Sequence, residues 1–263
     1  MMMRYIYLLA VAVSVLTACE SSDNNTASTA DTSTGDSKDT SDAIFYASLN
    51  QAIHLGQYDG AVQVRELKEN GDFGVGSGEK LKSELVMLDG VAYSIPASGE
   101  ASVLPDTAKV SFAAVKHFKS DQEVSISKML NLNELESYLD SVLTKNSFAA
   151  IKVTGKLNSI TYRSFYPQQK PYEPTEEVPE KELNRSNIEG TLVGFFTPES
   201  AEVLNSPVYH FHFVDNNKTT GGHVLDCTIS EARVEIDYAK QLQVALPDPE
   251  LVQHIDLNKP VRE

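Results

Sequence analysis

The 263-residue sequence contains no tryptophan, only two cysteines and few basic residues. Its 22 lysines and arginines stand against 37 aspartates and glutamates, which gives a formal net charge of −15. The acidic residues are spread along the chain, so we expect no Lys/Arg patch of the kind that phosphate contacts require. The composition therefore argues against a nucleic acid partner, and against attachment to anionic lipid by charge.

The apolar run at residues 6–15 is too short to cross a bilayer. A basic residue precedes this run and small residues follow it, a pattern typical of an export signal. The next residues, LTAC at 16–19, resemble the lipobox of bacterial lipoproteins, in which the cysteine is lipidated. We therefore expect a signal peptide over residues 1–18 and an exported protein, periplasmic or on the outer surface, anchored to a bacterial membrane through Cys19. The alternative is an ordinary secretory signal in which the cysteine stands by chance.

With Cys19 lipidated, Cys227 would be the only remaining thiol, so no intramolecular disulfide could form. The residues after Cys19 up to position 41 are rich in Ser, Thr, Asp and Asn and include no large apolar residue. Such a segment cannot bury enough surface to offset its ordering entropy. We therefore expect a lipidated cysteine and a disordered tether over residues 19–41, and stability that comes from packing or from a bound metal.

Patterns along the rest of the chain predict an α+β protein, with helices mostly in its first half and antiparallel strands in its second. Helical spacing predicts helices over residues 42–56, 62–70 and 132–143, the last capped by Asn131. Asp89-Gly90 predicts a two-residue turn in a hairpin over residues 83–95. The other expected strands are 110–118, 149–165 with a turn at 155–158, 190–196, 209–214, 223–229 and 233–236. Residues 166–187, rich in Pro and Glu, are expected to form a long loop.

The stretch GDFGVGSG, residues 71–78, is expected to form a glycine-rich loop. It is not a P-loop, because no Lys-Ser/Thr pair follows it. It also lacks the strand-to-helix setting of a dinucleotide-binding fingerprint. The sequence therefore indicates neither of these two nucleotide-binding motifs.

Three of the six histidines lie in the stretch VYHFHFVDNNKTTGGH, residues 208–223. Side chains alternate faces along a strand, so His210 and His212 would share a face about 7 Å apart at their Cα atoms. The polar turn that follows would bring His223 beside them. Three neutral imidazoles leave coordination positions open, as catalytic metal sites do. Zinc suits such ligands, although iron, nickel or manganese could be held similarly. The alternative is that these are partly exposed histidines of a half-buried sheet.

Two charged residues hold strand positions where they need a partner or solvent. Glu84 begins the expected strand that also carries Val86 and Leu88, and Arg163 interrupts the run ITYRSF. Metal sites that perform chemistry commonly use an acid or base as well. Glu84 and Arg163 are therefore candidates, although strand-end charges more often only reach solvent.

Five motifs together resemble the α-acetolactate decarboxylase family. They are GDFGVGSG (71–78), SELVMLDGVAY (83–93), YRSFYPQQKPY (162–172), IEGTLVGFFTPE (188–199) and PVYHFHFVDNNKTTGGHVLD (207–226). The motifs follow the order found in the family and extend over nearly the whole chain from about residue 43. The resemblance implies a mixed sheet with helices over residues 42–166. It also implies a mostly antiparallel, barrel-like part over residues 167–263 that carries the metal-binding histidines.

The resemblance also implies roles for individual residues. His210, His212 and His223 take the positions of the family's metal ligands, and zinc is the usual metal. The resemblance places Glu84 beside that metal and gives Arg163 the position of the active-site arginine. Ser77 stands where a hydroxyl residue follows the glycine-rich segment. The family also brings a glutamate from near the chain's end to the metal, for which Glu263 is the better candidate and Glu250 the fallback.

The function implied is metal-dependent decarboxylation of (S)-2-acetolactate to (R)-acetoin and carbon dioxide, with the metal stabilising an enediolate intermediate. The resemblance further implies a homodimer. Two alternatives remain open at this stage: another metal-dependent lyase or hydrolase on the same scaffold, or a non-catalytic, membrane-anchored metal-binding module.

Overall fold

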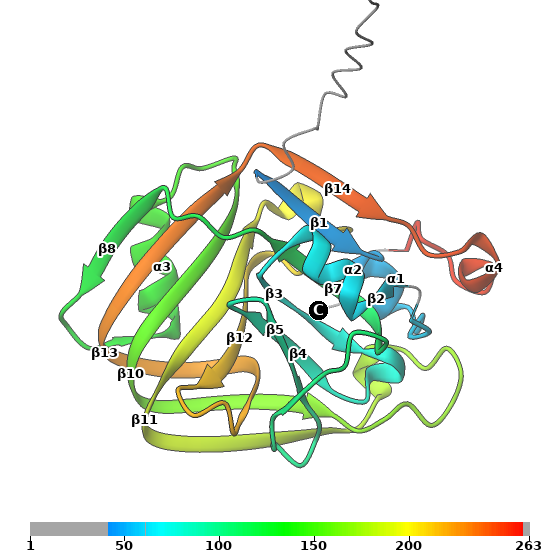
Figure 1. Cartoon of the computed structure of the whole chain (residues 1–263), viewed down its shortest axis with the longest axis horizontal. Helices are drawn as coiled ribbons and strands as arrows, with labels where there is room; N and C mark the ends of the chain where they lie inside the picture. The colour runs from blue at the N-terminus through cyan, green and yellow to red at the C-terminus, as the bar shows by residue number, and fades with distance from the viewer. Residues whose placement is uncertain (1–41, 61, 260–263) are drawn as a thin grey trace, which may run out of the picture. The chain divides into compact units, whose positions relative to one another are not determined.

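Two β-sheets dominate residues 42–60 and 62–259, the part of the chain that this computed structural model describes (Figure 1). The first sheet contains β1 (Ala43–Ala47), β2 (Val62–Gln63), β3 (Phe73–Gly78), β4 (Glu84–Leu88), β5 (Val91–Ile95), β6 (Ser102–Val103), β7 (Lys109–Lys116) and β14 (Gln241–Ala245). Its strand order is β14-β1-β7-β3-β4-β5-β6, and β2 pairs with β7. The β1–β14 pair is parallel and the others are antiparallel, so the sheet is mixed.

The second sheet contains β8 (Gln122–Ile126), β9 (Leu130–Asn131), β10 (Phe148–Phe165), β11 (Glu180–Thr197), β12 (Val208–Asp215) and β13 (Gly221–Ala239). All of its pairings are antiparallel. Because β10 and β12 each pair with both β11 and β13, the hydrogen bonding runs round these four strands. The predicted α+β class, with a mixed sheet and an antiparallel, barrel-like sheet, is confirmed in this form.

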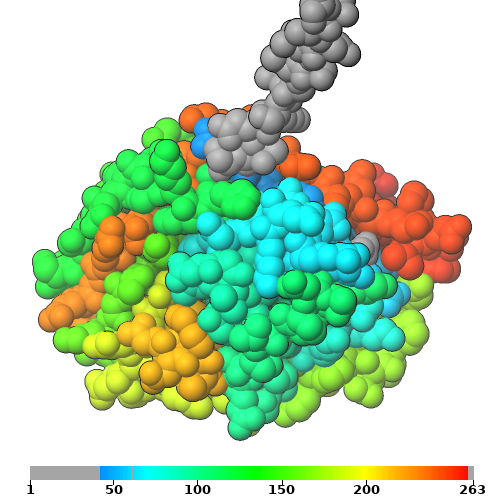
Figure 2. Space-filling model, in the orientation of Figure 1, coloured from blue at the N-terminus to red at the C-terminus, as the bar shows by residue number. Residues whose placement is uncertain are grey.

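The helices are few and short. They are α1 (Asn50–His54), α2 (Val64–Asn70), α3 (Leu132–Val142) and α4 (Pro249–Val252), with 3₁₀ turns η1 (Glu79–Leu81), η2 (Thr175–Glu177) and η3 (Glu199–Ala201). In Figure 2 the orange and red surface of β14 and α4 lies along one side of the molecule. No helix among the described residues has the length and apolar character that crossing a membrane requires.

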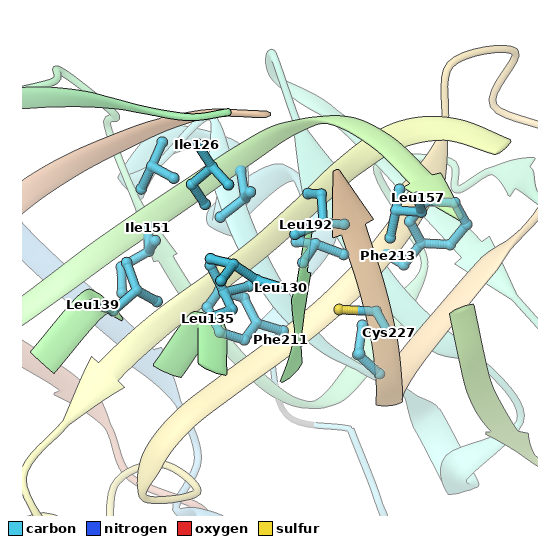
Figure 3. Packing of buried hydrophobic residues seen from close by; sticks show 14 of the residues in the cluster. Ile126, Leu130, Leu135, Leu139, Ile151, Leu157, Leu192, Phe211, Phe213 and Cys227 are labelled. Atoms are coloured by element: carbon cyan, nitrogen blue, oxygen red, sulfur yellow. The ribbon is translucent and has the colours of Figure 1, made fainter. Parts of the chain in front are cut away.

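Buried apolar side chains form a cluster between α3 and the second sheet (Figure 3). Leu135 and Leu139 of α3 are fully buried there with Phe211 and Phe213 of β12. Burying each such side chain contributes about 1.5–3 kcal/mol relative to leaving it exposed. The aromatic residues that alternate with His210 and His212 therefore fix one face of β12 in the core. The histidines must consequently face the other way.

A second cluster joins the two sheets. Val75 and Val86 of the first sheet pack in it with Val193 and Phe195 of β11. A buried ion pair also connects the sheets, since Lys116 Nζ of β7 lies 2.9 Å from Asp237 Oδ2 of β13. The site described below lies where β4 of the first sheet meets β12 and β13 of the second.

Two local predictions are confirmed in detail. The hairpin of β4 and β5 turns at Asp89 and Gly90, whose φ angles are 52° and 75° as a two-residue primed turn requires. Helix α3 begins after Asn131, whose side chain accepts from the backbone N–H of Glu134, while the Glu134 side chain accepts from the N–H of Asn131. Turn and cap chemistry therefore predicted the ends of these elements correctly.

The predicted helix over residues 42–56 is wrong in its first half. Residues 43–47 form β1, and only residues 50–54 form a helix. All five residues of β1 are buried between β7 and β14. A strand buried on both faces reads as a continuous apolar run, which periodicity cannot distinguish from a buried helix.

The predicted glycine-rich loop at residues 71–78 is also wrong, because residues 73–78 form β3 in the middle of the first sheet. A Cβ atom on Gly76 would lie 2.3 Å from the carbonyl oxygen of Phe112 in the neighbouring β7. Glycine is required here for close approach of two strands rather than for a turn.

The predicted turn at residues 155–158 does not exist, because β10 runs unbroken from Phe148 to Phe165. A Cβ atom on Gly155 would lie 2.1 Å from the carbonyl oxygen of Glu231 on β13, so this glycine again permits close strand approach. The predicted loop over residues 166–187 ends early, since β11 begins at Glu180. Residues 180–188 pair with β10 alone and are mostly exposed, which accounts for their polar composition.

The predicted division at residues 166 and 167 stays a prediction, and strands from both sides of it share the second sheet. The predicted signal peptide at residues 1–18 and the lipidated Cys19 with its tether lie outside the described residues, as does Glu263.

Candidate metal centre

Strands β12 and β13 bring three histidines to one point. His223 stands directly opposite His212 in the register of the two strands. The Nε2 atom of His210 lies 3.1 Å from Nε2 of His212 and 3.2 Å from Nδ1 of His223. One nitrogen from each ring lies within 4.8 Å of the others. Nitrogens bound at 2.0–2.1 Å to a tetrahedral zinc ion would be about 3.3 Å apart, so the spacing fits one ion.

Oxygen atoms behind two of the rings set their orientation. Nδ1 of His210 is 2.8 Å from Oδ1 of Asn205, and Nδ1 of His212 is 2.9 Å from the carbonyl oxygen of Leu85. An oxygen acceptor requires Nδ1 to carry the proton, so the Nε2 lone pairs of both rings face each other. Two lone pairs 3.1 Å apart cannot hydrogen-bond to each other, whereas a shared cation satisfies both. The donor set therefore fits a divalent metal.

Burial keeps the three imidazoles neutral. Removal from solvent lowers the pKa of His212 to about 3 and holds the pKa values of His210 and His223 well below the usual value. The Arg163 charge lowers all three pKa values further. Neutral imidazole is the form that binds metals.

Glu84, the first residue of β4, is 4% exposed and lies beside the histidines. Its Oε2 atom is 3.6 Å from Nε2 of His212, and its Oε1 atom is 3.5 Å from Nη1 of Arg163. Burial raises the pKa of the Glu84 carboxyl to about 7, and the Arg163 charge acts in the opposite direction. The structure thus places Glu84 between a histidine of the triad and the arginine.

Arg163 extends from β10, which lies beside β13. Its guanidinium lies over the Phe165 ring at 4.2 Å, and its Nε atom is 3.2 Å from Oε2 of Glu180. These contacts hold the planar group while leaving donors for a ligand. Ser77 stands opposite Glu84 in the pairing of β3 and β4. Its buried Oγ atom has no hydrogen-bond partner among the described residues.

These side chains line one pocket of about 310 Å³. Five of the site residues predicted from the sequence lie together with Ser77 in its wall: His210, His212, His223, Glu84 and Arg163. Another part of the lining comes from α1 and includes Asn50, Ile53 and His54. A pocket of this volume accommodates a small organic acid.

The two terminal glutamates are not both placed. Glu250 lies exposed in α4 and is not part of the pocket lining. Glu263 lies outside the described residues. Lys259, the last described residue, has its carbonyl oxygen within hydrogen-bond distance of the Gln51 side chain in α1.

Two residues of the site were not predicted from the sequence. His54 lines the pocket, and Asn205 orients His210. Asn205 lies in the connection between β11 and β12. Sequence spacing does not predict that a residue in such a connection contacts a histidine of the following strand. His54 offered one signal, because it is a histidine near the end of the helix predicted over residues 42–56.

Comparison with known proteins identifies the relatives of this chain. The sequence profile described as alpha-acetolactate decarboxylase matches residues 44–259. The chain is 35% identical over 217 residues to the alpha-acetolactate decarboxylase of Brevibacillus brevis, which covers 81% of this chain and 76% of the relative. The corresponding protein of Methanosarcina mazei is 37% identical over 214 residues, with coverages of 80% and 74%. The crystal structure of alpha-acetolactate decarboxylase from Bacillus subtilis strain 168 has a TM-score of 0.80 at 30% identity, covering 83% of this chain and 94% of that one.

Proposed function

Because this chain belongs to the alpha-acetolactate decarboxylase family, we propose that it converts (S)-2-acetolactate to (R)-acetoin and carbon dioxide. The observation that carries this proposal is the convergence of three unprotonated imidazole nitrogens in a pocket shared with Glu84 and Arg163. The proposed metal is Zn²⁺, which suits imidazole ligands, although another divalent ion could take its place.

The triad His210, His212 and His223 would hold the metal. What a bound divalent cation supplies is Lewis acidity toward the ketone and hydroxyl oxygens of the substrate. The bond to the carboxylate carbon breaks, and its electron pair moves toward the neighbouring carbonyl. A proton must then reach the carbon that has lost carbon dioxide.

Arg163 binds and orients the substrate. Its guanidinium is restrained by Glu180 and Phe165, so it can present two parallel N–H donors to a carboxylate or to an oxyanion. The free Oγ hydroxyl of Ser77 offers one further hydrogen bond at the same wall. Fixed donors of this kind orient the substrate and stabilise charge that develops during the reaction.

Among the described acids, Glu84 contacts the triad directly: its Oε2 atom is 3.6 Å from Nε2 of His212. We assign it to metal contact or to proton delivery on one face of the substrate, which would yield a single enantiomer. Glu263 is the proposed second acid. Lys259, the last described residue, contacts Gln51 of α1, the helix that contributes Asn50, Ile53 and His54 to the pocket lining.

Cellular placement and assembly rest on the sequence alone. The LTAC stretch supports lipidation of Cys19, and hence an exported enzyme held at a bacterial membrane. We retain the homodimer as a proposal that analytical ultracentrifugation of the purified protein would test. If the protein sedimented as a monomer at micromolar concentration, the homodimer would be contradicted.

The function is tested by supplying racemic acetolactate to the purified protein and measuring acetoin, with and without a chelator. We expect acetoin production that the chelator abolishes, together with about one metal ion per chain by elemental analysis. Metal without acetoin would instead favour a non-catalytic metal-binding module. Hydrolysis of esters or amides without acetoin would favour a hydrolase on the same scaffold.

A further inference from the structure

His54 lies in the part of the pocket wall that comes from helix α1 rather than from the strands. It is the last residue of α1, and it lines the pocket together with Asn50 and Ile53 of the same helix. The hydroxyl of Thr175 in η2 donates to the carbonyl oxygen of Ile53 at 3.1 Å, which ties α1 to that turn. The short helix and the loop that carries η2 are therefore adjacent, and α1 is labelled at the right of Figure 1.

The imidazole of His54 lies near a carboxylate, but one of its ring nitrogens has no hydrogen-bond partner among the described residues. Its Nδ1 atom is buried, and it makes no hydrogen bond to any described residue. The nearest carboxylate is Oε1 of Glu176 at 3.9 Å, a residue of η2 whose side chain is 47% exposed. The His54 side chain itself is 25% exposed. The pair therefore extends from open solvent to the lining of the pocket.

The charges around His54 oppose one another. Burial lowers the pKa of the imidazole, the Glu176 carboxylate raises it, and the Arg163 guanidinium lowers it. His54 also interacts electrostatically with His210 and His223, because it contributes to lowering their pKa values. Glu202 is an exposed acid in the pocket lining, to which Glu176 does not belong. An imidazole in such surroundings can accept a proton from one side and release it on the other.

The proposed reaction consumes one proton in every turnover. The carbon–carbon bond to the carboxylate breaks and carbon dioxide leaves. The electron pair that remains takes up a proton at carbon, so the substrate anion and one proton become neutral acetoin and carbon dioxide. The donor in the pocket must regain a proton from solvent water before the next cycle. Glu84, at 4% exposed, has little direct access to that water.

We propose that His54 and Glu176 form a proton relay that returns protons from solvent to the decarboxylation pocket. This inference rests on the proposed function and adds a route for the proton that the reaction consumes. Glu176 collects the proton at the surface and positions the imidazole. His54 carries the proton into the pocket. His54 is assigned by its place in the pocket wall, its buried Nδ1 atom and its proximity to an exposed carboxylate.

The test replaces His54 by Ala and separates a relay from a structural role by chemical rescue. We expect kcat for acetoin formation to fall roughly 100-fold, the lower end of the range for acid–base groups, with KM changed little. Added imidazole should restore kcat in proportion to its concentration. Phosphate, a proton carrier of different structure, should do so to a smaller extent. Glu176→Gln should lower kcat in the same direction by a smaller factor.

Controls make each outcome decisive. His54→Gln, which retains a polar side chain of similar length, should show the same loss and the same rescue. His117→Ala removes a histidine that does not line the pocket and should leave kcat unchanged. Metal content by elemental analysis should equal that of the wild type in every variant. An unchanged kcat in His54→Ala, or a loss confined to KM that buffers do not rescue, would overturn the relay. An inactive wild type would overturn the proposed function instead.

Discussion

The pocket has a wall made of strands and a wall made of short helices, and the two walls differ in burial and in proposed role. The strand wall holds three histidines, Glu84 and Arg163 on strands that hydrogen-bond on both sides. The helix wall comes from α1 and from Thr175 of η2. His54 is partly exposed there, beside the more exposed Glu176. Burial on the strand wall gives neutral imidazoles and a fixed cluster of ligands, as a metal requires. Partial exposure on the helix wall permits exchange with solvent. The difference in burial between the two walls thus assigns metal binding to the strand wall and proton supply to the helix wall.

The largest expected effect comes from breaking the strand wall. His212→Ala removes one ligand nitrogen and leaves only two imidazoles. We expect loss of bound metal and a fall in kcat/KM of at least about a thousandfold, which corresponds to about 4 kcal/mol of transition-state stabilisation. Elemental analysis and the acetoin assay measure the two effects on the same sample. Full activity in a metal-free variant would defeat the assignment of the triad.

Arg163→Lys tests whether the strand wall needs a planar donor or only a positive charge. Lysine keeps the charge beside Glu84 but loses the paired N–H groups and the stacking on Phe165. We expect kcat/KM to fall roughly 100-fold while metal content is unchanged, given the strength of paired charge-assisted hydrogen bonds. Arg185→Lys on β11 is the matched control, because Arg185 is exposed and outside the pocket lining. Equal activity of the two variants would contradict the proposed role.

Asn205→Ala probes the support behind the triad. It removes the oxygen that accepts from Nδ1 of His210 at 2.8 Å. Loss of such an outer partner typically weakens metal binding by about 10–100-fold, because the ring is no longer held in one orientation and tautomer. Titration against a competing chelator measures this shift. Asn216→Ala, on the exposed turn after β12, should leave the affinity unchanged.

The two walls also differ in how far the sequence predicted them. Alternation in VYHFHFV assigned His210 and His212 to one face, and the turn assigned His223 beside them, because strand geometry maps directly onto sequence spacing. Glu84 and Arg163 stood out as charges at strand positions. Their approach to the triad depends on how the two sheets pack, which no local pattern encodes; the family resemblance supplied it.

The helix wall was hidden from the sequence for physical reasons. The buried run of β1 has no periodicity that distinguishes it from a helix, so α1 was predicted as part of one longer helix. In the sheets a different limit applied, because Gly76 of β3 and Gly155 of β10 suggested a loop and a turn, whereas each permits close approach to a neighbouring strand. That distinction depends on long-range pairing. The contact between α1 and η2 joins residues more than a hundred positions apart, and it could not be inferred from spacing.

The smallest expected effect tests whether the walls are energetically independent. Thr175→Val removes the hydroxyl that donates to the Ile53 carbonyl oxygen, which still accepts from the backbone N–H of Gly56. A single partly buried hydrogen bond contributes about 1 kcal/mol, so the melting temperature should fall by about 2–4 °C for a domain of this size. Thr175→Ser keeps the donor and should melt nearly like the wild type. Because the triad is held by strands and by Asn205, metal affinity should stay constant in both variants. A weakened metal affinity in Thr175→Val would show that the helix wall also supports the metal centre, and that the division of roles between the two walls is wrong.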